Sequence, residues 1–335
     1  MIPHNRIIAT EAHIDAVSRT LRNAHLARGQ EIAALENDFC VYTGRKHAVA
    51  VASGLDALRL ALLWRRDLTP TVPAYSCVAL VNAVYSYSDY VGVADCSTDR
   101  NKGWTLDKDD LDGEPERAAV VAVNTFGMKA DIPKDAAYVI EDATHGFGGR
   151  SCQAEVTVLS LGATKLFGAP DSKGGIILTD NKEIADFCRD RRCYDDKEAS
   201  GTRLNSTMTD KDAALARVTL ANIAAIKDER LSIALDYARH LEWAQDNNLL
   251  ALPPFGDRTW YRFVVHTSRP ASLARAALHR RGIMAEKPIE WWPEDRVQNP
   301  VAWRAYENNL SLPFFPGITK AEISEVCHAV CEVLK

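Results

Sequence analysis

Tyr138-Val-Ile-Glu-Asp-Ala-Thr-His145 and Val156-Thr-Val-Leu-Ser-Leu-Gly-Ala-Thr-Lys165 are the two stretches that indicate the architecture of this chain. Each begins with an apolar, β-branched run of strand length and ends in polar residues, as buried parallel strands do. In doubly wound α/β sheets, ligands bind beyond the carboxyl ends of such strands. We therefore expect four reactive side chains to meet at one edge of a sheet, namely Asp142, His145, Ser160 and Lys165.

The strand-like pattern recurs through the first two-thirds of the chain. Five further segments carry it, at residues 48–52, 71–72, 91–95, 118–124 and 174–180. Segments of helical or loop character separate them, and two amphipathic helices are predicted ahead of the first, over 11–24 and 30–42. This alternation predicts an α/β fold with one mostly parallel, seven-stranded sheet flanked by helices.

The pattern changes in the last third. A charged stretch at about 181–208 is predicted to be a loop, and a long helix is predicted from Thr209 to about Trp243. After Pro253-Pro254 the sequence predicts a strand and two further helices, at residues 260–265, 270–281 and 318–334. We therefore divide the chain into a large α/β domain, residues 1–235, and a small C-terminal α+β domain, residues 236–335.

Composition favours a globular protein that acts on small molecules. The 335 residues are 47% hydrophobic and carry a net charge of −5, without the basic runs that nucleic-acid or membrane-surface binding requires. No signal peptide or membrane span is predicted, so we expect a cytoplasmic protein. The eight cysteines form no Cys-x-x-Cys pair, which argues against a disulfide framework or a metal site.

A possible phosphate site lies nearer the N-terminus. The strand at 48–52 turns at Ser53-Gly54 into a strong helix pattern, and a helix start offers free N–H groups and partial positive charge to a phosphate. Alone this signal is weak, since every α/β protein has such turns. Together with a lysine and a strand-end carboxylate it favours pyridoxal 5'-phosphate (PLP), held by Lys165 as a Schiff base with Asp142 keeping the pyridine nitrogen protonated.

Each of these residues also has an ordinary interpretation. Taken alone, Lys165 is typical of a surface lysine after a strand, Asp142 of a helix cap, and His145 of a half-buried imidazole. Lys173 is the competing lysine nearby. The cluster of Arg189, Arg191 and Arg192 is most simply a solvated helix end, and a role in binding a substrate phosphate is the alternative.

The motifs, in their order and spacing, resemble the DegT/DnrJ/EryC1/StrS family of PLP-dependent, fold-type-I enzymes, which are mostly nucleotide-sugar aminotransferases. The resemblance runs along nearly the whole chain. It rests on Ala52-Ser53-Gly54 with Asp56-Ala57-Leu58, Val72-Pro73, Ile140-Glu-Asp-Ala143 with His145, Ser160 with Thr164-Lys165, Gly174-Gly175, Asn205 with Met208-Thr-Asp, and Leu310-Ser-Leu-Pro313.

The resemblance implies a role for each candidate residue. Lys165 would form the Schiff base, Asp142 would pair with the pyridinium nitrogen, and His145 would contact the phenolic oxygen of the ring. The phosphate would be bound by Gly54, Leu55 and Ser160, joined by Asn205 from the second subunit of a homodimer. The implied reaction moves an amino group from glutamate or glutamine to a keto group of a nucleotide-linked sugar.

Several positions depart from the family pattern. Leu55 stands where a Thr or Ser is usual, which removes one hydroxyl from the phosphate site, and Cys77 replaces the aromatic residue that stacks on the pyridine ring. Asn124 stands where a His is common, and Thr207 where a Lys or Arg is frequent. The alternatives are a sugar dehydratase, which in this family has histidine in place of the lysine, and a non-catalytic regulatory member.

Overall fold

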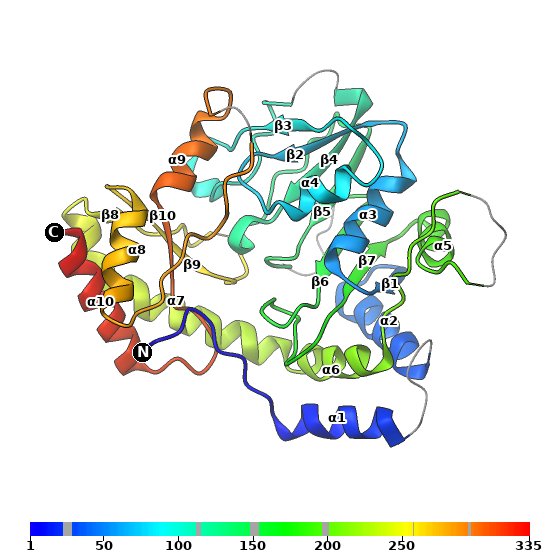
Figure 1. The fold of residues 1–335 in the computed structure, drawn as a ribbon, viewed down its shortest axis with the longest axis horizontal. Coiled ribbons are helices and arrows are strands. Elements are labelled where there is room, and N and C mark those ends of the chain that lie inside the picture. Colours follow the sequence, from blue (N-terminus) through cyan, green and yellow to red (C-terminus); the bar gives the residue numbers. More distant parts are fainter. Residues whose placement is uncertain (23–28, 112–114, 148–153, 196–200, 257, 294–295) are drawn as a thin grey trace.

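A seven-stranded sheet forms the centre of the molecule (Figure 1). The computed structural model describes residues 1–335 except 23–28, 112–114, 148–153, 196–200, 257 and 294–295. The strands lie in the order β1-β7-β6-β5-β4-β2-β3. Their bounds are β1 His47–Val51, β2 Thr69–Pro73, β3 Gly92–Ala94, β4 Ala118–Val123, β5 Tyr138–Asp142, β6 Val156–Ser160 and β7 Gly175–Thr179. β7 runs antiparallel to both of its neighbours, β1 and β6, and the other four neighbouring pairs are parallel, so the predicted mostly parallel sheet is confirmed.

Helices cover both faces of this sheet. One face packs against α3 (Gly54–Trp64), α4 (Ala79–Val84) and α5 (Lys182–Arg191). The other packs against α2 (Gln30–Thr43) and α6 (Asp210–Ala221), and α1 (Glu11–Arg22) lies outside α6 (Figure 1). Successive side chains of a strand point to opposite faces. Because nearly all the strand residues are apolar, both faces of the sheet bury apolar side chains against these helices. No helix in the described residues has the length and apolar character needed to cross a bilayer.

Two helical predictions need correction. The stretch at 181–208, predicted to be a loop, contains α5, whose start is capped by the Asn181 side chain accepting from the Glu183 N–H. Its buried face is short, and the surrounding charges hide it in the sequence. The single helix predicted from Thr209 is two helices, α6 and α7 (Ile223–Asp246), which meet at Asn222.

The C-terminal part is built on a three-stranded antiparallel sheet in the order β10-β9-β8. Its elements are β8 Leu250–Ala251, β9 Phe263–Thr267, α8 Ala271–Arg280, α9 Pro300–Asn308, β10 Asn309–Leu312 and α10 Lys320–Leu334. Their apolar core includes Ile2, and the Ile2 N–H donates to the Gly282 carbonyl at 2.8 Å. The domain division at 235/236 stays a prediction, and that position lies inside α7.

Candidate active site

A single cavity lies beyond the carboxyl ends of β5 and β6. Six of the seven residues predicted from the sequence line it: Gly54, Leu55, Asp142, His145, Ser160 and Lys165. Asn205, the seventh, is exposed and does not line the cavity. The acid, imidazole, hydroxyl and amine therefore do converge, as the strand-end argument requires.

The register of the strands explains how the turn after β1 reaches this cavity. Gly175 pairs with both Val51 of β1 and Ser160 of β6. A Cβ atom at Gly175 would lie 2.4 Å from the Ser53 carbonyl oxygen, so the missing side chain lets the turn approach β7. As a result, the position of a Cβ at Gly54 is only 3.1 Å from Ser160 Oγ.

The start of α3 supplies hydrogen-bond donors. The Ser53 side chain caps the helix by accepting from the Asp56 N–H at 3.0 Å. The N–H groups of Gly54 and Leu55 have no acceptor within the helix, since the first turn of any α-helix leaves its donors unused. With the helix dipole and Ser160 Oγ beside them, these groups form a site suited to a phosphate.

Asp142 is buried at the end of β5, with 2% of its surface exposed. Its Oδ1 accepts the Thr144 N–H at 2.9 Å. Burial raises the pKa of Asp142, opposed by the Thr144 hydrogen bonds and the positive charge of Lys165. A buried carboxylate that lines a cavity is stabilised by a cationic donor, and a protonated pyridine nitrogen is such a donor.

His145 is held as a neutral imidazole. Burial lowers its pKa well below the usual value, and the charges of Lys165 and Arg262 lower it further. The Phe126 N–H donates to His145 Nδ1 at 3.4 Å, so the ring proton belongs on Nε2. We therefore infer that His145 is a hydrogen-bond donor through Nε2, which is the property that contact with a phenolate oxygen requires.

Sequence reasoning did not identify Tyr261 as part of this site. Its ring stacks on His145 with centroids 4.5 Å apart, and Lys165 Nζ lies 5.1 Å from its centre. Burial raises the pKa of Tyr261, but the charges of Lys165 and Arg262 outweigh burial and bring the pKa down to about 8. The sequence shows Tyr261 only within a predicted strand, with no signal that this strand returns over the lysine.

Close backbone approach brings Tyr261 to the site. The Thr259 N–H donates to the Gly127 carbonyl at 2.8 Å. Gly127 has φ +89°, and a Cβ atom there would lie 1.5 Å from the Thr259 carbonyl oxygen. Only glycine allows this contact, which fixes the segment that carries Tyr261 against the loop after β4.

The family departures fall in different places. Cys77 lines the cavity, together with Ile289 from the C-terminal part. Asn124 does not line it: its amide donates to Glu141 Oε1 at 2.9 Å and to the Gly146 carbonyl at 3.0 Å, so it holds the loops around the site. Thr207 and Lys173 also lie outside the cavity lining.

The arginines near the end of α5 contact the protein itself. Arg192 Nη1 forms a salt bridge with Glu36 at 2.7 Å and donates to the Ala50 carbonyl at 2.6 Å. Arg189 donates to the Ala48 carbonyl at 3.1 Å. These contacts tie α5 to β1 and α2, and neither arginine lines the cavity.

Two named proteins are similar to this chain over nearly all of its length. The dTDP-3-amino-3,4,6-trideoxy-alpha-D-glucose transaminase of Streptomyces venezuelae is 27% identical over 356 residues, which cover 95% of this chain and 90% of that protein. The UDP-N-acetyl-3-dehydro-alpha-D-glucosamine 3-aminotransferase of Acidithiobacillus ferrooxidans is 26% identical over 352 residues, covering 96% and 93%.

A solved structure and a family profile complete the comparison. The putative sugar aminotransferase Spr1654 from Streptococcus pneumoniae, in its PLP form, has a TM-score of 0.87 and 17% identity, covering 99% of this chain and 98% of that one. This likeness confirms the predicted fold-type-I architecture. The profile of the DegT/DnrJ/EryC1/StrS aminotransferase family matches residues 8–331. The chain therefore belongs to the DegT/DnrJ/EryC1/StrS aminotransferase family.

Proposed function

We propose that this protein is a PLP-dependent aminotransferase that moves an amino group from an amino acid, glutamate or glutamine, to a keto group of a nucleotide-linked sugar. The observation that carries the proposal is the cavity shared by Lys165, Asp142, Ser160 and the start of α3. Each group matches one part of PLP: an amine for its aldehyde, a carboxylate for its pyridine nitrogen, and N–H and hydroxyl donors for its phosphate.

The residues around the cavity would hold and orient this cofactor. The N–H groups of Gly54 and Leu55, with Ser160 Oγ, would bind the phosphate. Asp142 would accept a hydrogen bond from the ring nitrogen and keep it protonated, because a buried carboxylate is stabilised by such a partner. His145 Nε2–H would donate to the phenolic oxygen, and Cys77 and Ile289 would border the ring without an aromatic stack.

Lys165 would anchor the cofactor and move the proton. PLP supplies a carbonyl that condenses with amines and a ring that accepts electrons from the adjacent carbon. The Lys165 amine would be placed to take a proton from the carbon that bears the donor nitrogen and to return it elsewhere. The centre of the Tyr261 ring lies 5.1 Å from Lys165 Nζ, so Tyr261 would orient this amine and help exclude water.

The names of the relatives support a substrate class. Both names refer to a nucleotide-linked sugar with an amino or keto group at carbon 3. We therefore propose carbon 3 as the position aminated here. The dehydratase alternative loses support because position 165, which lines the cavity, holds a lysine where those enzymes have a histidine. The non-catalytic alternative rests on Leu55, Cys77 and Thr207, whereas the presence of both Asp142 and Lys165 in the cavity lining supports an active enzyme.

We also propose a homodimer in which Asn205 serves the partner's phosphate site. Asn205 is exposed in its own subunit. Large apolar side chains are exposed along the N-terminal segment and α1: Ile7 44%, Ile8 55%, Ile14 51% and Leu21 60%. Exposed apolar side chains of this kind suit association with a second copy. A cytoplasmic location is consistent with Cys96, Cys188 and Cys327, which lie buried as free thiols.

Replacing Lys165 tests the proposed reaction. Lys165→Ala should eliminate amino transfer from glutamate to dTDP- or UDP-linked 3-keto sugars, because no other amine in the cavity lining can take its place. Lys173→Ala is the matched control and should retain transfer, since Lys173 is exposed and lies outside the cavity lining. Product formation by mass spectrometry checks both variants, and full transfer by Lys165→Ala would contradict the proposal.

Mixed dimers extend the same test to Asn205. If Asn205 acts in the partner's site, a hybrid of Lys165→Ala and Asn205→Ala subunits contains one site with both residues intact. Mixing the inactive Lys165→Ala protein with the weakened Asn205→Ala protein, and allowing subunits to exchange, should then raise transfer above that of either variant alone. If Asn205 instead acted within its own subunit, every site in the hybrid would lack one residue and mixing would restore nothing.

Adding the missing hydroxyl should tighten cofactor binding. Leu55→Thr places a donor at the start of α3, and one hydrogen bond to a charged group is worth about 1.5–3 kcal/mol, a roughly 10- to 150-fold lower Kd for PLP. Leu55→Val is the control, because valine has the same branched shape as threonine but no hydroxyl. Equilibrium dialysis of PLP measures both, and equal affinities for the Thr and Val variants would show that the hydroxyl does not reach the phosphate.

Tyr261→Phe should remove one ionisation from the cofactor-free protein. With a pKa of about 8 in the fold against 10.0 for an ordinary tyrosine, Tyr261 loses its proton first in the folded state. The wild type should therefore gain stability over Tyr261→Phe as pH rises above about 8, and lose this advantage as pH falls through that value. Tyrosinate absorbance and denaturant titrations at several pH values check this, and superimposable titrations of the two proteins would refute it.

A further inference from the structure

A second large cavity lies between α9 and the C-terminal sheet. Its volume is about 820 Å³. One face of α9 forms a wall of it, through Pro300, Trp303, Arg304, Glu307 and Asn308. This spacing follows the turn of a helix, and the opposite face of α9, with Ala302 and Ala305, is buried in the protein. Residues of β8, β9, the end of α7 and the helical turn Arg100–Lys102 line the rest.

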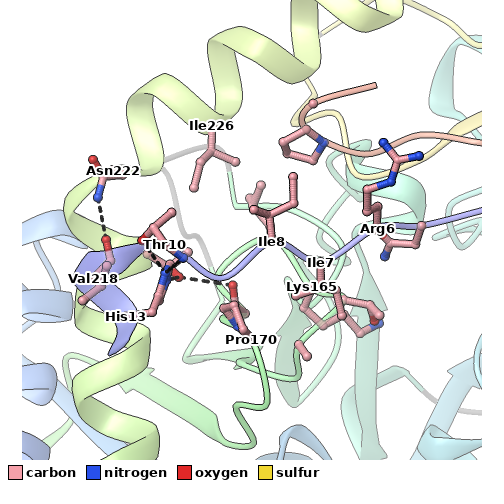
Figure 2. Close-up of a pocket in the computed structure, with 18 of the residues that line it drawn as sticks. Arg6, Ile7, Ile8, Thr10, His13, Lys165, Pro170, Val218, Asn222 and Ile226 are labelled. Atoms are coloured by element: carbon pink, nitrogen blue, oxygen red, sulfur yellow. Dashed lines mark hydrogen bonds between the residues drawn. The ribbon is translucent and has the colours of Figure 1, made fainter. Parts of the chain in front are cut away.

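This cavity is separate from the spaces around the reactive lysine. Among the described residues, it shares no lining residue with the cavity that contains Asp142, or with the cavity of about 580 Å³ in Figure 2, which Lys165 and Ile226 line. Ile226 and Gln245, which lines the second cavity, both belong to α7. At 1.5 Å per residue they are about 28 Å apart along the helix. A ligand in the second cavity would therefore not reach the Lys165 amine.

The lining of the second cavity carries more positive than negative charge. Three arginines line it, Arg100, Arg296 and Arg304, and Glu307 is the one acid among its described residues. All three arginines are exposed, and none forms an ion pair with a described residue. The whole protein has a net charge of −5. An excess of arginine on this concave surface is therefore a local feature, and it attracts anions.

An aromatic contact holds Arg296 in the cavity wall. The guanidinium carbon of Arg296 lies 4.0 Å from the centre of the Trp303 ring. Trp303 itself contacts Trp291 and Tyr306, with ring centres 4.9 and 5.3 Å away. A cation–π contact uses the face of a guanidinium and leaves the N–H donors at its edge for an acceptor.

His266 shows that Arg100 and Arg304 act at the same point of the cavity. His266 belongs to β9, lines the cavity, and has its ring centre 5.0 Å from that of Trp104. Burial lowers the pKa of His266, its hydrogen bond with Asn309 opposes this, and the charges of Arg100 and Arg304 lower the pKa further. Both guanidinium groups therefore lie close enough to one ring to disfavour its protonation, although they come from distant segments. An anion beside that ring would be attracted to both.

We propose that this cavity binds a phosphate-bearing anion, with Arg100 and Arg304 as its principal contacts and Arg296 as a further one. An arginine presents paired N–H donors that match two oxygens of a phosphate, and it stays charged at neutral pH. The volume lies in the range of sites for small organic ligands, so a nucleoside phosphate fits as well as inorganic pyrophosphate. The side chains of Gln245 and Asn248 also line the cavity and offer hydrogen bonds to the remainder of a larger ligand.

Calorimetric titration of inorganic pyrophosphate into the PLP-loaded protein tests the site without relying on amino transfer. Arg100→Leu and Arg304→Leu should each raise the Kd of pyrophosphate about 10- to 100-fold, because each removes a charged pair of donors. Both positions are exposed, so the changes leave the core intact. Arg304→Lys should recover part of the loss. Arg280→Leu, exposed and outside the lining, is the matched control and should leave the Kd unchanged.

The His266 ring gives a second readout, by NMR, with its signal assigned from its absence in His266→Gln. A bound anion offsets the two arginine charges, so pyrophosphate should raise the pKa of His266 in the wild type. In the ligand-free protein, Arg304→Leu should itself raise this pKa, since the Arg304 charge lowers it. Adding pyrophosphate to that variant at a concentration that saturates the wild type should then change the pKa less.

Titration of uridine diphosphate distinguishes the two sources of the phosphate. A lower Kd for the nucleotide than for pyrophosphate, weakened by a similar factor in Arg304→Leu, would support a nucleotide ligand, and equal values would support the inorganic anion. Three results would overturn the proposal: no binding of pyrophosphate to the wild type, binding unchanged in Arg100→Leu and Arg304→Leu, or a His266 titration that a saturating anion does not move. A loss in Arg304→Leu alone would also contradict it, because the anion would then not lie between the two arginines.

Discussion

The burial of the Asp142 carboxyl at the end of β5 is the constraint on which the site depends. A carboxylate out of water is unfavourable without a positive or hydrogen-bonding partner. Thr144 supplies one hydrogen bond and Lys165 supplies charge, yet burial still raises the pKa of Asp142. A bound cation would therefore stabilise the ionised form of Asp142. The start of α3 and Ser160 line the same cavity and would bind the phosphate at the other end of PLP.

The C-terminal part of the chain takes part in the same site. The Thr259 N–H is bonded to the Gly127 carbonyl, and this contact brings Tyr261 over His145 and toward Lys165. On another side, Trp292 Nε1 donates to the Ser76 carbonyl at 3.0 Å, next to Cys77 in the cavity wall. Asp95 accepts the N–H groups at the start of α9. These contacts join the two parts around the reactive lysine, so changes in the C-terminal part can alter its chemistry.

The strand-end rule explains what the sequence could predict. Asp142 and Ser160 end adjacent parallel strands, so their proximity follows from local patterns alone. Tyr261 could not be placed, because its approach depends on Gly127 and on a contact between segments more than 130 positions apart. Asn124 departs from the family pattern, and the sequence could not show that its amide donates to groups within the protein. The apolar face of α5 was too short to stand out from its charges.

The protonation state of the bound cofactor tests the central claim most directly. Nitrogen NMR of the enzyme loaded with PLP isotopically labelled in the ring reports whether the pyridine nitrogen carries a proton. The account predicts a protonated nitrogen in the wild type across neutral pH and an unprotonated one in Asp142→Ala, because the buried carboxylate is the group that holds the proton in place. An unprotonated nitrogen in the wild type, or a protonated one unaffected by the loss of Asp142, would contradict it.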